Sequence, residues 1–497
     1  MDAETLRQDV REGRVDADRL VDLIASLQRQ LVSAHERILE LEKKIGSSPT
    51  AKIDPSFSVN AEEKRQEARG KKKREKKPKG RRGRLTTAEK VAKAERTEKV
   101  YPEGLDPNVC KLSHTRAVWR FEQGRSLLIA YEIYRGPNNQ YGKIPGVLGR
   151  SEFGLEIVVS IAYLVNLVGL SFDKVCLVLN FLQNLPLKKS QADAVLRQLS
   201  RHWEKEFDAL CLLMANSAIV HADETGWSIN SVWAFLSEKA RIVWFGVHKD
   251  AETLKMILDP ATFEGIVISD DAAVYANFTR SQKCWAHLLR KAIKLTLRDP
   301  ENPKYRDLTD ELLAIYREAR RVQSDGTLNP AGRTATVILL ENRMIELCGW
   351  AWLHNEGPIP GLEDDYRLLM SELIDLLMQK QLFTFVTEPG VMQPNGQEMP
   401  VPGTNNEAER TLRPSAEARK TGRTNKTVKG ARRRTVLTSV FESLRLYLPI
   451  FSLKSVIEEI KHWSEVGQSC FQQLVEKLQL QVPEKSLLDC LLPNPSG

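Results

Sequence analysis

The sequence SAIVHADETGWSINSVWAFLSEKARIVWFGV, residues 217–247, contains three short segments rich in β-branched and aromatic residues, at 218–223, 232–236 and 242–247. Such residues favour β-strands, and the polar residues between the second and third segments favour a turn. A fourth apolar segment, GIVISD at 265–270, follows a predicted helix at 252–258. Three strands in a meander, then a helix and another strand, favour a mixed sheet of the ribonuclease H type. We therefore expect an α/β core, although the sequence does not determine the strand order.

Two acidic residues end apolar segments of this predicted sheet. Asp223 ends the first segment and Asp270 ends the fourth. A carboxylate at a strand end has a rigid backbone and access to solvent, which suits a ligand of Mg²⁺. Each has an acidic neighbour, Glu224 or Asp271, and successive side chains on a strand point to opposite faces. Only one residue of each pair can therefore point into a common site.

Helical patterns follow the predicted sheet, at residues 285–297, 305–348 and 366–381. A Pro- and Gly-rich loop, TEPGVMQPNGQEMPVPGT at 387–404, separates them from a further helix that begins near Asn406. In this last helix Glu407 and Glu409 are about 200° apart, so one of them at most can face a metal site. The spacing alone does not decide which one. Alternatively, Glu409 pairs with Asn406 as an N-terminal cap or with Arg413 as a salt bridge.

Residues 116–211, before the sheet, have a helical pattern with apolar stretches at 127–134, 155–170 and 175–182. A last helix from about 190 to 206 would complete a helix-turn-helix. Residues on or near this helix that would face DNA are Lys188, Lys189, Gln191, Arg197 and Arg201. The alternative is an ordinary helical bundle with polar outer residues.

The N-terminal part combines a heptad pattern with a basic segment. Apolar residues alternate in steps of three and four from Leu20 to Ile45, which predicts a short dimeric coiled coil or, alternatively, an amphipathic helix packed on its own chain. Residues 64–84 then contain thirteen Lys or Arg against two Glu. This segment is either a flexible arm that neutralises DNA phosphates or a solvated linker. The arm residues that we expect to contact DNA are Lys71, Lys72, Lys73, Arg74, Lys76, Lys77, Arg81, Arg82 and Arg84.

Composition and charge narrow the cellular context and the partner. The formal net charge of +8 is unevenly distributed, which favours nucleic acid first and an acidic membrane surface second. The seven cysteines include no CxxC pair, which indicates a reduced, cytoplasmic protein. The N-terminal residues lack a secretory pattern, and the longest uncharged run, 157–172, is too short to span a bilayer. We expect no membrane association.

A second basic segment follows Glu409. Residues 410–434 hold ten basic residues and one acid, so they either grip phosphates near the scissile bond or form a solvated basic face. The DNA-contact candidates here are Arg413, Arg419, Lys420, Arg423, Arg432, Arg433 and Arg434.

Four strings resemble, in order, the catalytic motifs of DDE transposases of the insertion-sequence 66 family: HADETGW, ISDDAAVY, KCWAHLLRKA and NNEAERTLRP. The resemblance implies that the catalytic, metal-binding acids are Asp223, Asp270 and Glu409. Asp270 is chosen because Tyr275 lies five residues beyond it, whereas Asp271 stands where the family usually has Gly. It also implies an α-helical insertion between His287 and Thr404. Supporting active-site residues would be Cys284, His287, Asn406 and Arg410.

This resemblance implies a DNA transposase that cuts transposon ends and joins the freed 3′-hydroxyl to target DNA, using two Mg²⁺ ions or Mn²⁺ in their place. Cys284 and His287 lack a second ligand pair, so zinc is not expected, and the Cys-rich finger of the family is reduced to Cys110. Expected partners are double-stranded DNA, further copies of the chain and accessory proteins of the same element, in the bacterial nucleoid. The alternatives are a nuclease or resolvase without strand transfer and a domesticated transposase acting as a DNA-binding regulator.

The predicted domains follow from these patterns. They are a coiled coil at 1–46, a basic linker at 47–100, a helical DNA-binding domain at 101–216, the first part of the core at 217–299, an α-helical insertion at 300–403, the last part of the core at 404–452 and a helical tail at 453–497.

Overall fold

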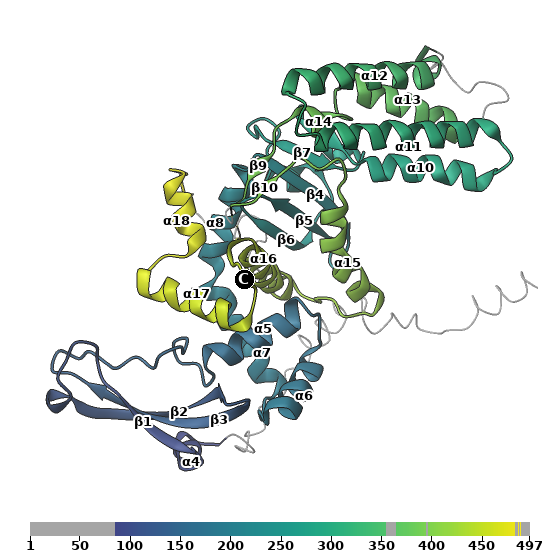
Figure 1. Cartoon of the computed structure of the whole chain (residues 1–497). Helices are drawn as coiled ribbons and strands as arrows, with labels where there is room; N and C mark the ends of the chain where they lie inside the picture. Colours follow the sequence, from purple (N-terminus) through teal and green to yellow (C-terminus); the bar gives the residue numbers. More distant parts are fainter. Residues whose placement is uncertain (1–84, 354–363, 394–395, 483–485, 487, 489–497) are drawn as a thin grey trace, which may run out of the picture. The chain divides into compact units, whose positions relative to one another are not determined.

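The computed structural model describes residues 85–353, 364–393, 396–482, 486 and 488 (Figure 1). All of them belong to the second of two units into which the chain divides, Gly70–Gly497. The predicted coiled coil and the basic arm up to Arg84 lie outside the described residues. No helix among the residues described is long and apolar enough to cross a membrane.

A small sheet precedes the helices and corrects part of the sequence interpretation. After α4 (Thr87–Ala92), strands β1 (Arg96–Val100), β2 (Lys111–Glu122) and β3 (Arg125–Arg135) form a sheet of order β1-β3-β2. The predicted helix at 127–134 is therefore wrong, and the linker predicted to reach residue 100 ends earlier. Most of β3 is buried, so it reads as a continuous apolar run, which periodicity does not distinguish from a buried helix. A two-residue turn with positive φ at Gln123 and Gly124 closes the β2–β3 hairpin.

Four helices follow in the part for which the sequence predicts helices, although the single helix predicted from about 190 to 206 ends at His202 and a separate helix begins at Glu204. They are α5 (Leu155–Asn166), α6 (Phe172–Gln183), α7 (Lys189–His202) and α8 (Glu204–Ala215). Asn184, in the left-handed conformation, ends α6 and begins the turn into α7. Their buried faces share one core with the five-stranded sheet, through Leu196, Phe207 and Val220.

The five-stranded sheet has the order β6-β5-β4-β7-β8. β5 (Ser231–Ser237) pairs antiparallel with both β4 (Ile219–Gly226) and β6 (Arg241–Val247). β7 (Ile266–Ser269) pairs parallel with β4 and with β8 (Ser281–Lys283). Helix α9 (Ala251–Lys255) and the 3-10 turn η2 (Ala273–Tyr275) flank β7 in the chain. The four predicted strands are thus confirmed within a few residues, and the short polar strand β8 was not predicted.

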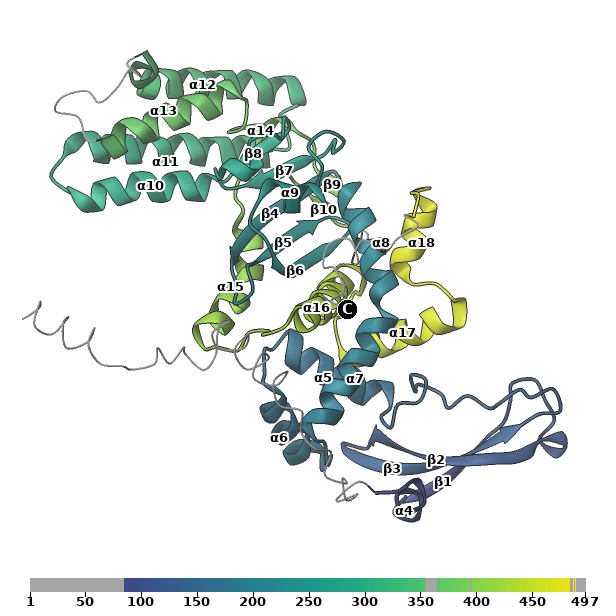
Figure 2. The same cartoon turned by 180° about the vertical axis from the view of Figure 1, so that it is seen from behind.

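The edge strand β6 is covered by α16 (Val428–Tyr447), which lies beside it in both views (Figure 2). The backbone N–H groups of Arg241, Val243 and Phe245 donate to the hydroxyls of Ser443, Ser439 and Thr435 at 2.9, 3.0 and 3.0 Å. The three hydroxyls are four residues apart on the helix, which is about 6 Å, and the three N–H groups are two residues apart on the strand, which is about 6.6 Å. Because the two spacings are similar, each hydroxyl lies beside the next N–H group on the strand edge. The hydroxyls therefore satisfy a strand edge that would otherwise remain unpaired.

Helices between β8 and α15 pack on the other face of the sheet. They are α10 (Trp285–Arg298), α11 (Pro303–Ser324), α12 (Pro330–Leu353), α13 (Asp364–Met378) and the short α14 (Thr384–Thr387). Their core includes Ile219, Ile266 and Ile268 of the sheet. A two-stranded ribbon of β9 (Val391–Met392) and β10 (Glu398–Met399) follows.

The last helices return to the first core. α15 (Asn406–Lys420) lies along β4 and β5, and α17 (Leu453–Val466) and α18 (Cys470–Lys477) pack on α5 and α8. Helix α15 is the element that brings the third predicted acid to the sheet.

Candidate active site

Asp223 and Asp270 lie on the same side of the sheet. The parallel register pairs Ile219 with Ile266 and His221 with Ile268, so one further step of two residues brings Asp223 opposite Asp270, directly after β7 ends. Because side chains alternate along a strand, the two carboxylates share one face. Asp270 Oδ1 accepts the N–H of Ala272 at 3.0 Å, which fixes the side chain at this strand end.

Glu224 points to the opposite face. Its Oε2 accepts the Tyr275 hydroxyl at 2.5 Å, and its Oε1 lies 2.6 Å from Nζ of Lys249. The side chain is almost completely buried in this arrangement. Glu224 is therefore committed to contacts behind the sheet, which leaves Asp223 as the acid of its pair that faces α15.

The carboxylates gathered here repel one another. Burial, and then the charges of Glu224 and Asp270, raise the pKa of Asp223 to about 7. Glu409 adds to the same shift. Acids from β4, the end of β7 and α15 are thus close enough to act on one group. Such a cluster is stabilised by a bound cation.

Asp271 is engaged elsewhere. It forms an ion pair with Lys291 of α10, and the same Nζ contacts Glu372 of α13 at 2.7 Å. Although burial opposes the shift, hydrogen bonds with Glu372 and Lys291 lower the pKa of Asp271 to about 2. Burial and the contact with Asp271 raise the pKa of Glu372 to about 7. Asp271 therefore ties the end of β7 to the helices α10 and α13.

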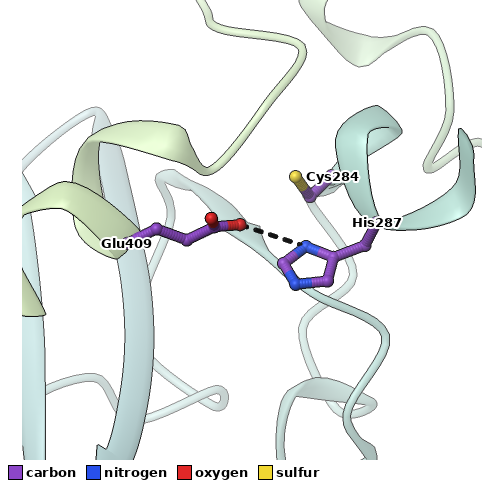
Figure 3. Close-up of side chains that lie close together, drawn as sticks. All are labelled: Cys284, His287 and Glu409. Atoms are coloured by element: carbon purple, nitrogen blue, oxygen red, sulfur yellow. Dashed lines mark ion pairs between the residues drawn. The ribbon is translucent and has the colours of Figure 1, made fainter. Parts of the chain in front are cut away.

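The two acids in the first turn of α15 also have different partners. Glu407 forms an ion pair with Arg241 at 2.5 Å. Glu409 faces α10 instead, where its Oε1 lies 3.6 Å from Nδ1 of His287 (Figure 3) and 3.0 Å from the guanidinium of Arg290. The alternative pairings of Glu409 with Asn406 or Arg413 are replaced in the structure by these contacts between helices.

Asn405 holds the start of α15 against the sheet, and the sequence interpretation did not include it. Its side chain is fully buried: Oδ1 lies 3.0 Å from Nδ1 of His221, and Nδ2 donates to the Ala222 carbonyl at 2.8 Å. Its N–H donates to Sγ of Cys284 at 3.1 Å. The predicted neighbour Asn406 is partly exposed, and its carbonyl accepts from Arg410 Nε at 3.2 Å. The sequence signal for this residue was the pair of asparagines in NNEAER, and the first of the two, Asn405, is the buried one.

Cys284, His287 and Glu409 form a group whose ligand atoms lie within 4.8 Å of one another (Figure 3). Cys284 is the N-cap residue of α10, and burial raises the pKa of its thiol. The Nδ1 atom of His287 is buried and has no hydrogen-bond partner among the described residues. Sulfur, nitrogen and oxygen donors together suit a softer ion than Mg²⁺. The sequence offered only Cys284 and His287 for such an ion, and the structure adds Glu409 as a third possible ligand.

Basic residues predicted to contact DNA converge from two parts of the chain. A pocket of about 580 Å³ lies between α7 and the start of α16. Its lining residues are Arg197, Ser200, Arg201, Glu204, Lys429, Arg432 and Arg433. Asp193 pairs with Arg197 at 2.8 Å and with Arg433 at 2.5 Å, and Glu204 lies 3.5 Å from Arg432. Five basic side chains therefore outnumber the two acids of this group.

The other predicted DNA contacts are more dispersed. Lys188 is the N-cap residue of α7, and Lys189 pairs with Asp173 of α6 at 2.5 Å. Gln191 accepts the N–H of Lys188 at 3.0 Å and so serves the helix start. The predicted contacts Arg413, Arg419, Lys420 and Arg423 of the second basic segment are all exposed. Arg434 differs from them because it packs against aromatic rings.

A mixed α/β fold with a carboxylate cluster at one end of its central strands defines the chain as a candidate enzyme. The sequence model of one family, described as Transposase IS66 family, matches residues 150–433. This match covers more than half of the chain, so the protein belongs to the IS66 family of transposases. No curated protein is similar enough to match it.

Proposed function

We propose that this transposase is a DDE enzyme that cuts DNA at transposon ends and joins the freed 3′-hydroxyl to target DNA. The observation that carries the proposal is the convergence of Asp223, Asp270 and Glu409 from β4, the end of β7 and α15. The strand order β6-β5-β4-β7-β8 supports a ribonuclease H type of core. In that core the helices between β8 and α15 are the insertion that separates Glu409 from the two aspartates.

The donor set fits a hard divalent ion. Three carboxylates, with the pKa of Asp223 raised first by burial and then by its neighbours, favour oxygen-seeking Mg²⁺ or Mn²⁺. When bound, two such ions supply Lewis-acid activation of water or a 3′-hydroxyl and stabilise the leaving oxygen. Asp223, Asp270 and Glu409 would hold these ions, and Asp223 is the acid on which the charges of the other two act.

Neighbouring residues position these acids. Asn405 fixes the start of α15 four residues before Glu409, and His287 and Arg290 set the direction of the Glu409 side chain. The Lys291 contact of Asp271 favours Asp270 as the ligand of the pair. Arg410 is exposed on α15 and would face the DNA rather than the acids.

DNA contact is assigned to the basic pocket between α7 and α16. Arg197, Arg201 and Lys429 line it, and phosphate contacts from such residues give salt-dependent affinity without reading sequence. The arm residues from Lys71 to Arg84 would extend this contact. Because two transposon ends must be joined in one event, we also propose a dimer or larger assembly, with accessory proteins of the same element as further partners.

The test uses the full chain with labelled duplex DNA that carries the ends of its own element, together with a target plasmid and Mg²⁺. Cleaved ends and joined products on the target are expected from the wild type, and neither from Asp223→Asn. Cleaved ends without joined products would instead support a nuclease or resolvase. Binding without cleavage in Mg²⁺ or Mn²⁺ would contradict the proposal and favour a DNA-binding regulator.

A further inference from the structure

Arg434 of α16 lies against two aromatic rings. Its guanidinium carbon is 5.1 Å from the ring centroid of Trp227 and 4.8 Å from that of Phe245. Trp227 directly follows β4, and Phe245 belongs to β6, so both rings are fixed by the sheet. The two rings also contact each other edge to face at 5.2 Å between centroids. The position of the guanidinium is therefore set by a rigid aromatic surface.

This arginine has no anionic partner among the residues described. Its Nε atom is buried without a hydrogen-bond acceptor in the same part of the structure. Burial, and then the positive charge of Arg423, lower the pKa of Arg434 to about 10, so it remains a cation at neutral pH. Aromatic rings attract a cation but do not accept its N–H groups in the way a carboxylate does.

The two preceding arginines provide an internal comparison. Arg432 lies 3.5 Å from Glu204, and Arg433 lies 2.5 Å from Asp193. Helix α16 therefore presents three consecutive arginines of which the first two have acids supplied by α7 and α8. The third has no such acid among the described residues, and the charge that acts on it is that of Arg423, whose guanidinium donates to the Gly169 carbonyl and the Thr421 hydroxyl.

A second donor without an acceptor lies beside Arg434. Trp227 is 6% exposed, and its Nε1 has no hydrogen-bond partner among the described residues. Buried N–H groups are normally paired, so each exception calls for an explanation. Two N–H donors without acceptors, a cationic neighbour and no acid nearby are together what a bound oxyanion would satisfy.

The location relates this group to the proposed catalytic acids. Trp227 lies four residues beyond Asp223, directly after the end of β4, which corresponds to roughly 13 Å of extended chain. A nucleic acid strand advances about 3.4 Å per nucleotide along the axis of a duplex. A phosphate beside Trp227 would therefore be a few nucleotides from a bond cut at the acids.

We propose that Arg434, Arg423 and Trp227 form a seat for one backbone phosphate of the DNA substrate. Arg434 and Arg423 supply the positive charge, and Trp227 Nε1 supplies a directed neutral donor. The inference rests on the proposed function, because the ligand of this site would be a phosphodiester of the DNA substrate. The basic character of residues 410–434 does not show which of them bind a phosphate, whereas this inference names the residues of one phosphate site.

The test measures binding of a duplex DNA oligonucleotide of arbitrary sequence to the full chain by fluorescence anisotropy at several salt concentrations. Arg434→Met keeps the side-chain bulk and removes the charge. It should weaken binding roughly tenfold and reduce the slope of log affinity against log salt by about 1. Arg434→Lys should keep the wild-type slope. The matched control is Arg445→Met on the same helix, because Arg445 also stacks on a ring but pairs with Glu442 at 3.2 Å. A folded Arg434→Met protein with the wild-type slope would overturn the proposal.

Trp227→Phe gives a second test if Arg434→Met fails to fold. It keeps an aromatic surface under Arg434 and removes only the N–H donor. We expect roughly three- to tenfold weaker DNA binding with an unchanged salt slope. Wild-type affinity in this variant would overturn the role of Trp227 in the seat.

A measurement with inorganic phosphate tests the seat independently of the proposed function. It should raise the Tm of the wild type more than that of Arg434→Met, and this holds whether or not the protein cleaves DNA. Cleavage assays on the same wild-type sample report on the proposed function alone. Equal phosphate effects in wild type and Arg434→Met, in a protein that does cleave DNA, would reject the seat and leave the proposed function standing.

Discussion

The side-chain oxygen of Asn405 lies 3.0 Å from Nδ1 of His221, a residue 184 positions earlier in the chain. Both side chains are buried, and burial lowers the pKa of His221, so its ring is neutral. This contact joins the start of α15 to β4. It therefore sets the distance between the helix that carries Glu409 and the strand that carries Asp223.

Replacing Asn405 with Ala should destabilise the protein by about 2–4 kcal/mol, because it leaves the His221 ring nitrogen and the Ala222 carbonyl buried without partners. The free energy of unfolding in urea measures this change. Asn406→Ala is the matched control, since Asn406 is partly exposed, and it should change stability by about 0.5 kcal/mol or less. Equal effects of the two substitutions would contradict the positioning role of Asn405.

Ser439→Ala should destabilise the protein by about 1–3 kcal/mol, because the N–H of Val243 on the edge strand would lose its acceptor. The neighbouring residue provides the control. Thr438 is also buried, but its hydroxyl has no hydrogen-bond partner among the described residues, so Thr438→Val should be neutral or stabilising. If Ser439→Ala is as stable as Thr438→Val, α16 does not satisfy the sheet edge in the way described.

The stability of the metal-free protein should depend on pH through Asp223. Burial and nearby acids raise its pKa from the ordinary value of 3.8 to about 7, so the folded state binds more protons than the unfolded state between these values. The contribution of Asp223 to stability therefore falls as pH rises from about 4 to 7. At pH 8 in EDTA, Asp223→Asn should be more stable than the wild type by roughly 2–4 kcal/mol, as measured by urea unfolding.

Asp271→Asn is the control for this pH effect. Despite the opposing effect of burial, hydrogen bonds with Glu372 and Lys291 lower the pKa of Asp271 to about 2, so its contribution is present above pH 4 and is lost as pH falls toward 2. The Asp271 variant should accordingly be less stable than the wild type at pH 8. Stabilisation by both substitutions, or by neither, would be inconsistent with the separate environments of the two aspartates.

Zn²⁺ should inhibit Mg²⁺-dependent cleavage, because Cys284 and His287 lie within reach of Glu409 and offer softer donors. Binding there would draw Glu409 away from the aspartates. Cys284→Ser should shift the inhibition to about tenfold higher Zn²⁺ in a cleavage titration. The same inhibition in wild type and Cys284→Ser would show that Zn²⁺ acts at another site.

The sequence predicted those strands of the sheet in which both the residue types and their spacing favour a strand. Segments such as IVWFGV became β6 because β-branched and aromatic residues there have no helical spacing. The same reasoning failed at β3, since a strand buried on both faces has no alternation and resembles a buried helix. β8 was missed because Ser281, Gln282 and Lys283 are polar, and their strand depends on pairing with β7 rather than on local preference.

For the candidate site, the sequence identified pairs of acids and left the choice within each pair to resemblance. Parallel register supplies a physical reason for Asp223 and Asp270, and the partners of Glu224 and Asp271 account for the other member of each pair. Such contacts join residues far apart in the chain, so spacing does not reveal them. Asn405 was overlooked for the same reason, because only folding distinguishes the buried asparagine of the pair.

The most direct test of the account is single-turnover cleavage of labelled end DNA in Mg²⁺ by five variants of the full chain. Asp223→Asn, Asp270→Asn and Glu409→Gln should each lose at least about a thousandfold in rate, as expected when a ligand of a two-metal centre is removed. Asp271→Asn and Glu407→Gln should retain cleavage within about tenfold of the wild type, since neither acid is among those that raise the pKa of Asp223, and Lys291 and Arg241 engage them instead. Loss of cleavage in Asp271→Asn or Glu407→Gln, with retention in Asp270→Asn or Glu409→Gln, would contradict the assignment of the three acids.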